Sequence, residues 1–145
     1  MAFRFSLATV LRVRESLERN EERALQKIQL AMARVVHQVD ELTAQITKLH
    51  EAREKALREP VAASHLHMLL GDATAAGERK KVLLDDLHIL EQQRDQQILR
   101  YQVAHRDRET LTDLSDNQKE SYEQDQLRAQ QRALDDIFMA RRHQG

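Results

Sequence analysis

Few side chains in this 145-residue sequence have types and spacing that could perform chemistry. His65 and His67 could bind a metal ion, but alternate residues of a helix point to different sides, and neither a cysteine nor a helical His-x3-His pair accompanies them. Asp85-Asp86 and Asp135-Asp136 are adjacent carboxylates, which act in acid–base catalysis only when a cleft shields them from water. Without a nucleophile elbow or a glycine-rich phosphate loop, we expect no catalytic residue, no metal site and no cofactor.

The element that would have to position any site is a helix through residues 25–49. Its apolar residues recur at steps of three and four, the period of a helix that packs along a partner helix. These predicted seam residues are Leu25, Ile28, Met32, Val35, Val39, Leu42, Ile46 and Leu49. A stripe this narrow needs a partner to be buried against.

Start and stop signals predict two long helices joined by a turn. Ser6 is a candidate N-cap, and Pro60 disfavours helix at the residue before it, so the first helix should end near Arg58. Residues 59–78 are interpreted as a turn that holds one short helix, capped by Ser64 and ended by Gly71. The second helix is expected at 79–142, with Leu83, Leu87, Leu90, Ile98 and Tyr101 in its seam.

The predicted fold is therefore all-α: a long antiparallel two-helix coiled-coil hairpin with a short helix in the connecting turn, forming one domain over residues 1–145. Folding back near residue 69 would pair residues whose numbers add to about 138. That register gathers apolar side chains at the open end of the hairpin, namely Phe5, Leu7, Val10, Leu11, Leu134, Ile137 and Phe138. They could form a docking patch, or they could only close the end of the hairpin on each other.

The start of the first helix breaks the regular seam. Extending the seam backwards from Leu25 meets charged residues at Glu21, Glu18 and Arg14. An alternative set of helical positions, in a second phase, is more apolar over this part of the helix. It joins the seam by two consecutive steps of four residues, which predicts a stutter. This second phase consists of Val10, Val13, Leu17, Asn20 and Ala24, and the stutter of Ala24, Ile28 and Met32.

Composition excludes several kinds of protein. The net charge is −1, and acidic residues interleave with the basic run from Arg12 to Lys27, so no phosphate-binding stripe forms and nucleic-acid binding is not expected. There is no cysteine for a disulfide, and no apolar run reaches the roughly 20 residues of a membrane span. We expect no direct membrane insertion.

Both ends of the sequence resemble the FliJ family of flagellar export proteins. The first stretch, Phe3-Arg4-Phe5-Ser6-Leu7-Ala8-Thr9-Val10-Leu11-Arg12-Val13-Arg14, has the family's aromatic-basic-aromatic start, followed by Leu, Val-Leu and basic residues. Near the other end, Gln130-Gln131-Arg132 precedes Leu134-Asp135-Asp136-Ile137, which is similar to the family's Leu-acid-acid-apolar ending. Length and the two-helix layout also match.

The resemblance implies a stalk of the type III export apparatus, cytoplasmic and peripheral at the inner membrane. Its partners would be the hexameric export ATPase, reached through the paired termini, the cytoplasmic domain of the export gate, and export chaperones. Carried onto this sequence, the ATPase-binding tip is the apolar set at the open end. Gate contact in the family involves the hairpin-proximal part of the second helix, which here contains Gly71, Ala75, Ala76 and Gly77. Two alternatives are the stalk of a virulence secretion system and a structural homodimeric coiled coil.

Overall fold

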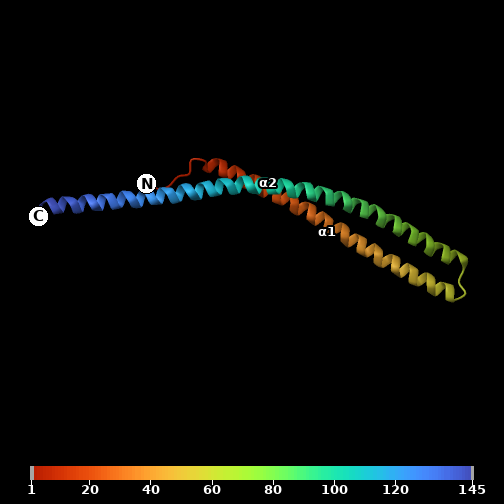
Figure 1. Cartoon of the computed structure of the whole chain (residues 1–145). Helices are drawn as coiled ribbons and strands as arrows, with labels where there is room; N and C mark the ends of the chain where they lie inside the picture. The colour runs from red at the N-terminus through yellow and green to blue at the C-terminus, as the bar shows by residue number, and fades with distance from the viewer. Residues whose placement is uncertain (1, 145) are drawn as a thin grey trace. The chain divides into compact units, whose positions relative to one another are not determined.

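The computed structural model describes residues 2–144, which form two α-helices. Helix α1 spans Ala8–Arg58 and helix α2 spans Ala63–Gln144. The two helices run antiparallel and pack against each other (Figure 1), and the described residues contain no strand. The prediction of an all-α helical hairpin is confirmed.

The connecting turn is much shorter than the sequence indicated. Only residues 59–62 lie between the helices, so the predicted turn at 59–78 and its separate short helix are wrong. Residues 63–78 are the start of α2. Gly71 and Gly77 lie inside the helix, and neither has a positive φ. Each interior glycine costs helix stability relative to alanine. Burial of Leu69 and Ala76 among the first turns of α2 offsets that cost.

The chain divides into two compact units. The hairpin unit is Glu22–Arg100, and the terminal unit comprises residues 2–21 and 101–144 of the described chain. Each unit contains part of both helices. That residues 1–145 form one domain stays a prediction.

The hairpin unit has a thin core at the contact between the helices. Leu42, Ala56, Leu69 and Ala76 are its buried apolar residues, and one polar residue, Gln97, is buried with them. The other predicted seam residues of this unit are half-buried: Leu25, Ile28, Met32, Val35, Val39, Ile46, Leu49, Leu83, Leu87, Leu90 and Ile98. Tyr101, also half-buried, belongs to the terminal unit. The buried side chain beside Ile98 is thus a glutamine, which the apolar pattern did not reveal.

In the terminal unit, α1 keeps the phase of the Leu25 seam. Arg14, Glu18 and Glu21 are half-buried, whereas Val13 is 53% exposed, and Val10 and Leu17 are exposed as well. The predicted stutter is therefore wrong. Charged residues occupy the seam because α2 supplies charged partners for them, which leaves the more apolar phase of α1 facing solvent.

The register of the terminal unit also differs from the prediction. The numbers of contacting residues add to 121 for Arg14 and Asp107, to 126 for Glu18 and Arg108, and to 125 for Phe3 and Tyr122. The predicted sum was about 138. The difference follows from the short connector, which moves the point of folding toward the N-terminus.

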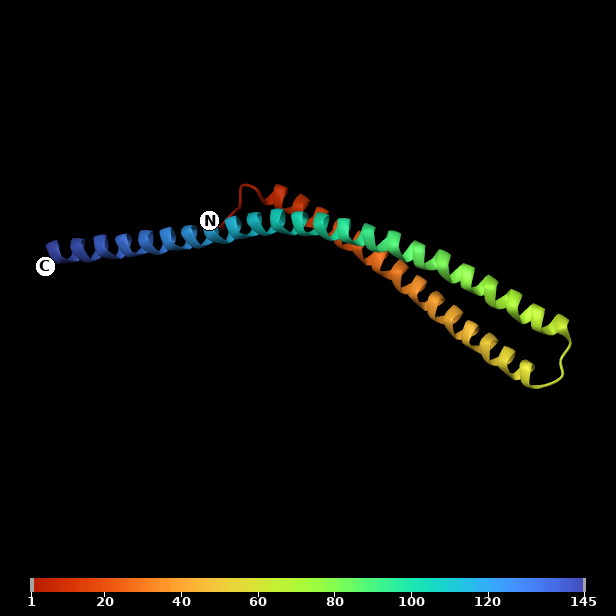
Figure 2. The same cartoon turned by 45° about the vertical axis from the view of Figure 1, so that its right-hand side comes forward.

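As a result, α2 extends past the start of α1. Residues 123–144 are all exposed, and both views show this end of α2 continuing alone beyond the N-terminal segment (Figures 1 and 2). We call residues 123–144 the C-terminal extension. The expectation that Leu134, Ile137 and Phe138 meet the apolar residues of the N-terminus is wrong. Tyr122 already lies beside Phe3, and Leu134 is some 18 Å further along the helix axis.

Candidate docking surfaces

An ionic network joins the helices of the terminal unit. The Nε of Arg108 donates a hydrogen bond of 2.6 Å to Oε2 of Glu18, and its Nη2 lies 3.5 Å from Oε1. His105 Nδ1 is 3.5 Å from the same Oε1, and Arg108 Nη1 donates to Thr112 Oγ1 at 3.4 Å. The Glu18 side chain is 16% exposed and that of Arg108 24%. Two charges are thus held between the helices with several polar partners.

This network shifts the titration of both of its central groups. The hydrogen bond from Arg108 lowers the pKa of the Glu18 carboxyl below its ordinary value of 4.5, against the opposing effect of desolvation. The same bond raises the pKa of the Arg108 guanidinium. A second pair, Arg14 Nη1 to Asp107 Oδ2 at 3.3 Å, lies one turn away and is more exposed. The seam period reaches Arg14 and Glu18 on α1, and charges at seam positions of both helices indicate such ionic contacts.

The outward face of α1 in the terminal unit is an apolar stripe. Its members are Leu7, Val10, Val13 and Leu17, all exposed and three or four residues apart. The stripe begins at the first turn of α1, where Leu11 N donates to Leu7 O at 2.9 Å. Two residues of the predicted tip, Phe5 and Leu11, are half-buried instead. We call Leu7, Val10, Val13 and Leu17 the α1 stripe.

The C-terminal extension carries the second exposed apolar set. Phe138 is 72% exposed, and Leu127, Leu134, Ile137 and Met139 are each more than half exposed. The ring of Tyr122 lies 5.7 Å from that of Phe3, in a tilted arrangement that marks the end of the paired region. The five exposed residues of the predicted tip therefore lie on two separate surfaces, whereas Phe5 and Leu11 belong to neither.

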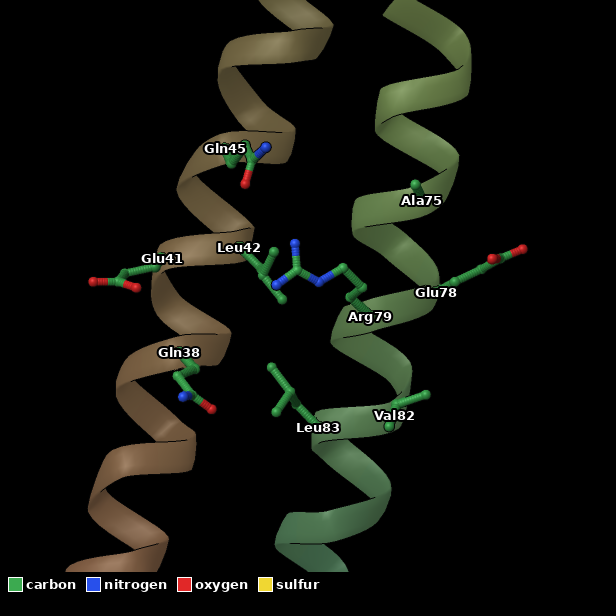
Figure 3. A pocket seen from close by; sticks show the side chains of 9 residues that line it. All are labelled: Gln38, Glu41, Leu42, Gln45, Ala75, Glu78, Arg79, Val82 and Leu83. Atoms are coloured by element: carbon green, nitrogen blue, oxygen red, sulfur yellow. The ribbon is translucent and has the colours of Figure 1, made fainter.

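The hairpin unit has a groove of about 700 Å³ between its helices. Leu42 and Leu83 point into the groove, and the guanidinium of Arg79 reaches between the helices toward Leu42 (Figure 3). Glu41 and Glu78 point away from it. The remaining lining residues are Gln38, Gln45, Ala75 and Val82. This surface offers apolar contact together with one cationic group, and the sequence pattern alone did not reveal it.

The candidates for chemistry are open to solvent, and Asp135-Asp136 lies within the C-terminal extension itself. His65, His67 and both aspartate pairs are exposed. Among residues 2–144, no group of three or more His, Cys, Asp or Glu side chains could hold a metal ion. Neither helix, over its described residues, is long and apolar enough to cross a membrane.

Two antiparallel helices with exposed apolar faces define the class of all-α helical hairpins. The model of the family described as flagellar FliJ protein matches residues 3–145, and the chain belongs to this family. It is thus an export-related stalk or chaperone-like component of the flagellar export apparatus. The members of this family are structural and non-enzymatic components. No curated protein and no solved structure matches the chain.

Proposed function

We propose that this chain is a stalk that binds the hexameric flagellar export ATPase through its terminal unit and contacts the export gate through its hairpin unit. The observation that carries the proposal is the exposure of apolar side chains from both helices in the terminal unit. Exposed apolar sets of this kind are typical of protein docking surfaces. The family supports the flagellar system over a virulence secretion system. Under this proposal the chain acts at the cytoplasmic face of the inner membrane.

Two separate surfaces favour an extended partner over a single small pocket. Leu134 lies about 18 Å beyond Tyr122 along α2, whereas the α1 stripe flanks the paired region. A ring of ATPase subunits has contact sites at different depths around its central opening. The C-terminal extension would enter such an opening first, and the α1 stripe would contact the ring nearer its rim.

The experiment is to measure stimulation of the purified export ATPase by the full chain and by two charge variants. Leu7→Asp and Ile137→Asp each place a carboxylate on one exposed surface, so both should fold with unchanged helicity and lose most of the stimulation. Leu84→Asp is the matched control, because Leu84 is 44% exposed, between Leu7 at 38% and Ile137 at 53%, but lies in the hairpin unit. Equal stimulation by all four proteins would refute ATPase docking at these surfaces.

For the gate, we propose the groove of the hairpin unit as the contact. The groove lies in the hairpin-proximal part of α2, and it combines apolar walls with the guanidinium of Arg79. Arg79→Glu should abolish capture of the gate's cytoplasmic domain, whereas Lys81→Glu, an exposed charge reversal outside the groove, should not. Capture that survives Arg79→Glu at the wild-type level would rule out this contact.

A further inference from the structure

The apolar face of the C-terminal extension points away from the side of α2 that packs on α1. Continuing the half-buried positions Arg108, Leu111, Ser115 and Tyr122 by steps of three and four reaches Asp125, Arg132 and Asp136. Leu127, Leu134 and Phe138 are out of phase with these and lie on nearly the opposite side of the helix, at 100° per residue, whereas Met139 continues the half-buried positions. A longer α1 would therefore not cover the first three, so this face fits a different helix.

The apolar face has a coiled-coil spacing of its own. Leu127, Gln131, Leu134 and Phe138 recur at steps of four, three and four residues. An isolated helix with such a stripe is only marginally stable in water. The flanking positions that follow the two leucines carry opposite charges, Arg128 and Asp135.

We propose that the C-terminal extensions of two copies of this chain pair antiparallel through this face, forming a dimer. In that arrangement Leu127 packs on Phe138 of the second copy, and Leu134 packs on Gln131 of the second copy. The twofold axis repeats both layers. Arg128 then lies beside Asp135 of the second copy, and its symmetry mate repeats that ion pair. The face is thus complementary to itself in charge, and the twofold axis repeats its Leu127–Phe138 contact.

A parallel arrangement of the same helices is less favourable. It would place Arg141, the next seam position after Phe138, against Arg141 of the second copy. The antiparallel arrangement instead brings Arg141 opposite Gln124. Like charges at a seam oppose pairing, and the antiparallel arrangement avoids this repulsion at Arg141.

The dimer would cover Leu134 and Phe138. If the proposed ATPase contact uses the same side chains, dimer formation and ATPase docking exclude each other. This consequence rests on the proposed function, whereas the dimer itself does not. The chain would then protect its exposed apolar end until the ATPase replaces the second copy.

The test is sedimentation equilibrium of the full chain from low micromolar to several hundred micromolar concentration. We expect a monomer–dimer equilibrium that Arg128→Asp and Asp135→Arg each weaken roughly tenfold, since each swap turns two attractive pairs into repulsive ones. The double variant should recover the wild-type constant within about threefold. Arg106→Asp, an exposed charge reversal outside the extension, is the control and should change nothing.

Orientation is tested separately by cross-linking, since the chain has no native cysteine. A mixture of Gln131→Cys and Leu134→Cys chains should form more disulfide dimer than either variant alone. The proposal is overturned if the chain stays monomeric throughout, if neither swap weakens the dimer, or if each cysteine variant cross-links best with itself. Sedimentation of the chain alone does not involve the ATPase, and ATPase stimulation by the wild-type chain and by Leu7→Asp does not depend on the dimer. Failure of the dimer and failure of the proposed function are therefore distinguishable.

Discussion

Removing the Glu18–Arg108 pair should destabilise the terminal unit measurably. Both side chains are more than three-quarters covered, and the shortest contact between them is 2.6 Å. Exposed pairs contribute about 0.2–1 kcal/mol, whereas breaking a fully buried pair costs about 3–5 kcal/mol. The pair lies between these limits and is supported by His105 and Thr112, so we expect a coupling free energy of about 1–2 kcal/mol.

The assay is a double-mutant cycle with Glu18→Gln, Arg108→Gln and the double variant, each unfolded by urea and followed by the helical circular dichroism signal. Glu41→Gln is the control, because its partner His37 forms an ion pair in which both side chains are mostly exposed. The control should change the free energy of unfolding by less than about 0.5 kcal/mol. Additive effects of the two substitutions would refute the conclusion that this pair joins the helices.

Three further predictions follow from burial, titration and backbone geometry. Because the folded-state pKa of Glu18 lies below 4.5, its stabilising effect is present above that pH and is lost as pH falls through the lowered value. Glu18→Gln should therefore flatten the acid limb of a stability profile below about pH 5, and an unchanged limb would contradict this. Leu42→Ala should cost about 2–3 kcal/mol in urea unfolding, against less than about 1 kcal/mol for Leu30→Ala, since Leu42 is buried and Leu30 is 56% exposed. Gly71→Ala and Gly77→Ala should each add about 0.5–1 kcal/mol to the free energy of unfolding and so raise the melting temperature. Both residues are helical, and apart from the surrounding turns of the same helix no atom lies within 4 Å of the added Cβ. A lower melting temperature would contradict the continuous α2.

The coiled-coil character of the chain could be predicted from the sequence, because Leu25–Leu49 repeats without interruption. The length of the connector could not. Gly71 and Gly77 are usual signs of a helix end, yet here they are carried through by the burial of Leu69 and Ala76. Tertiary packing outweighed local preference, as it does in most helices.

Register was the least predictable feature. A heptad pattern is preserved when one helix slides by seven residues, so the seam alone does not choose between registers. The length and position of the connector determine the register. An error in the predicted connector therefore shifts every predicted pair of contacting residues. For this reason the predicted cluster of Phe5 and Leu7 with Leu134 is absent, although these residues were rightly identified as apolar and terminal.

The charged start of α1 was interpreted from that helix alone. Its partner side chains on α2, Asp107 and Arg108, explain why Arg14 and Glu18 occupy the seam. Considering both helices together would have favoured the uninterrupted phase. The outward position of Val13 then follows from the spacing of these residues.

Helix α2 extends past the start of α1, and residues 123–144 are exposed. Distances between spin labels test this directly, with labelled chains diluted in unlabelled chain so that only intrachain distances are measured. All three labelled positions are exposed: Thr9→Cys with Asn117→Cys, and Thr9→Cys with Gln131→Cys. We predict a short distance for the first pair and a clearly longer one for the second, because position 131 lies about 21 Å further along the axis of α2 than position 117. A shorter distance between positions 9 and 131 than between 9 and 117 would contradict the account.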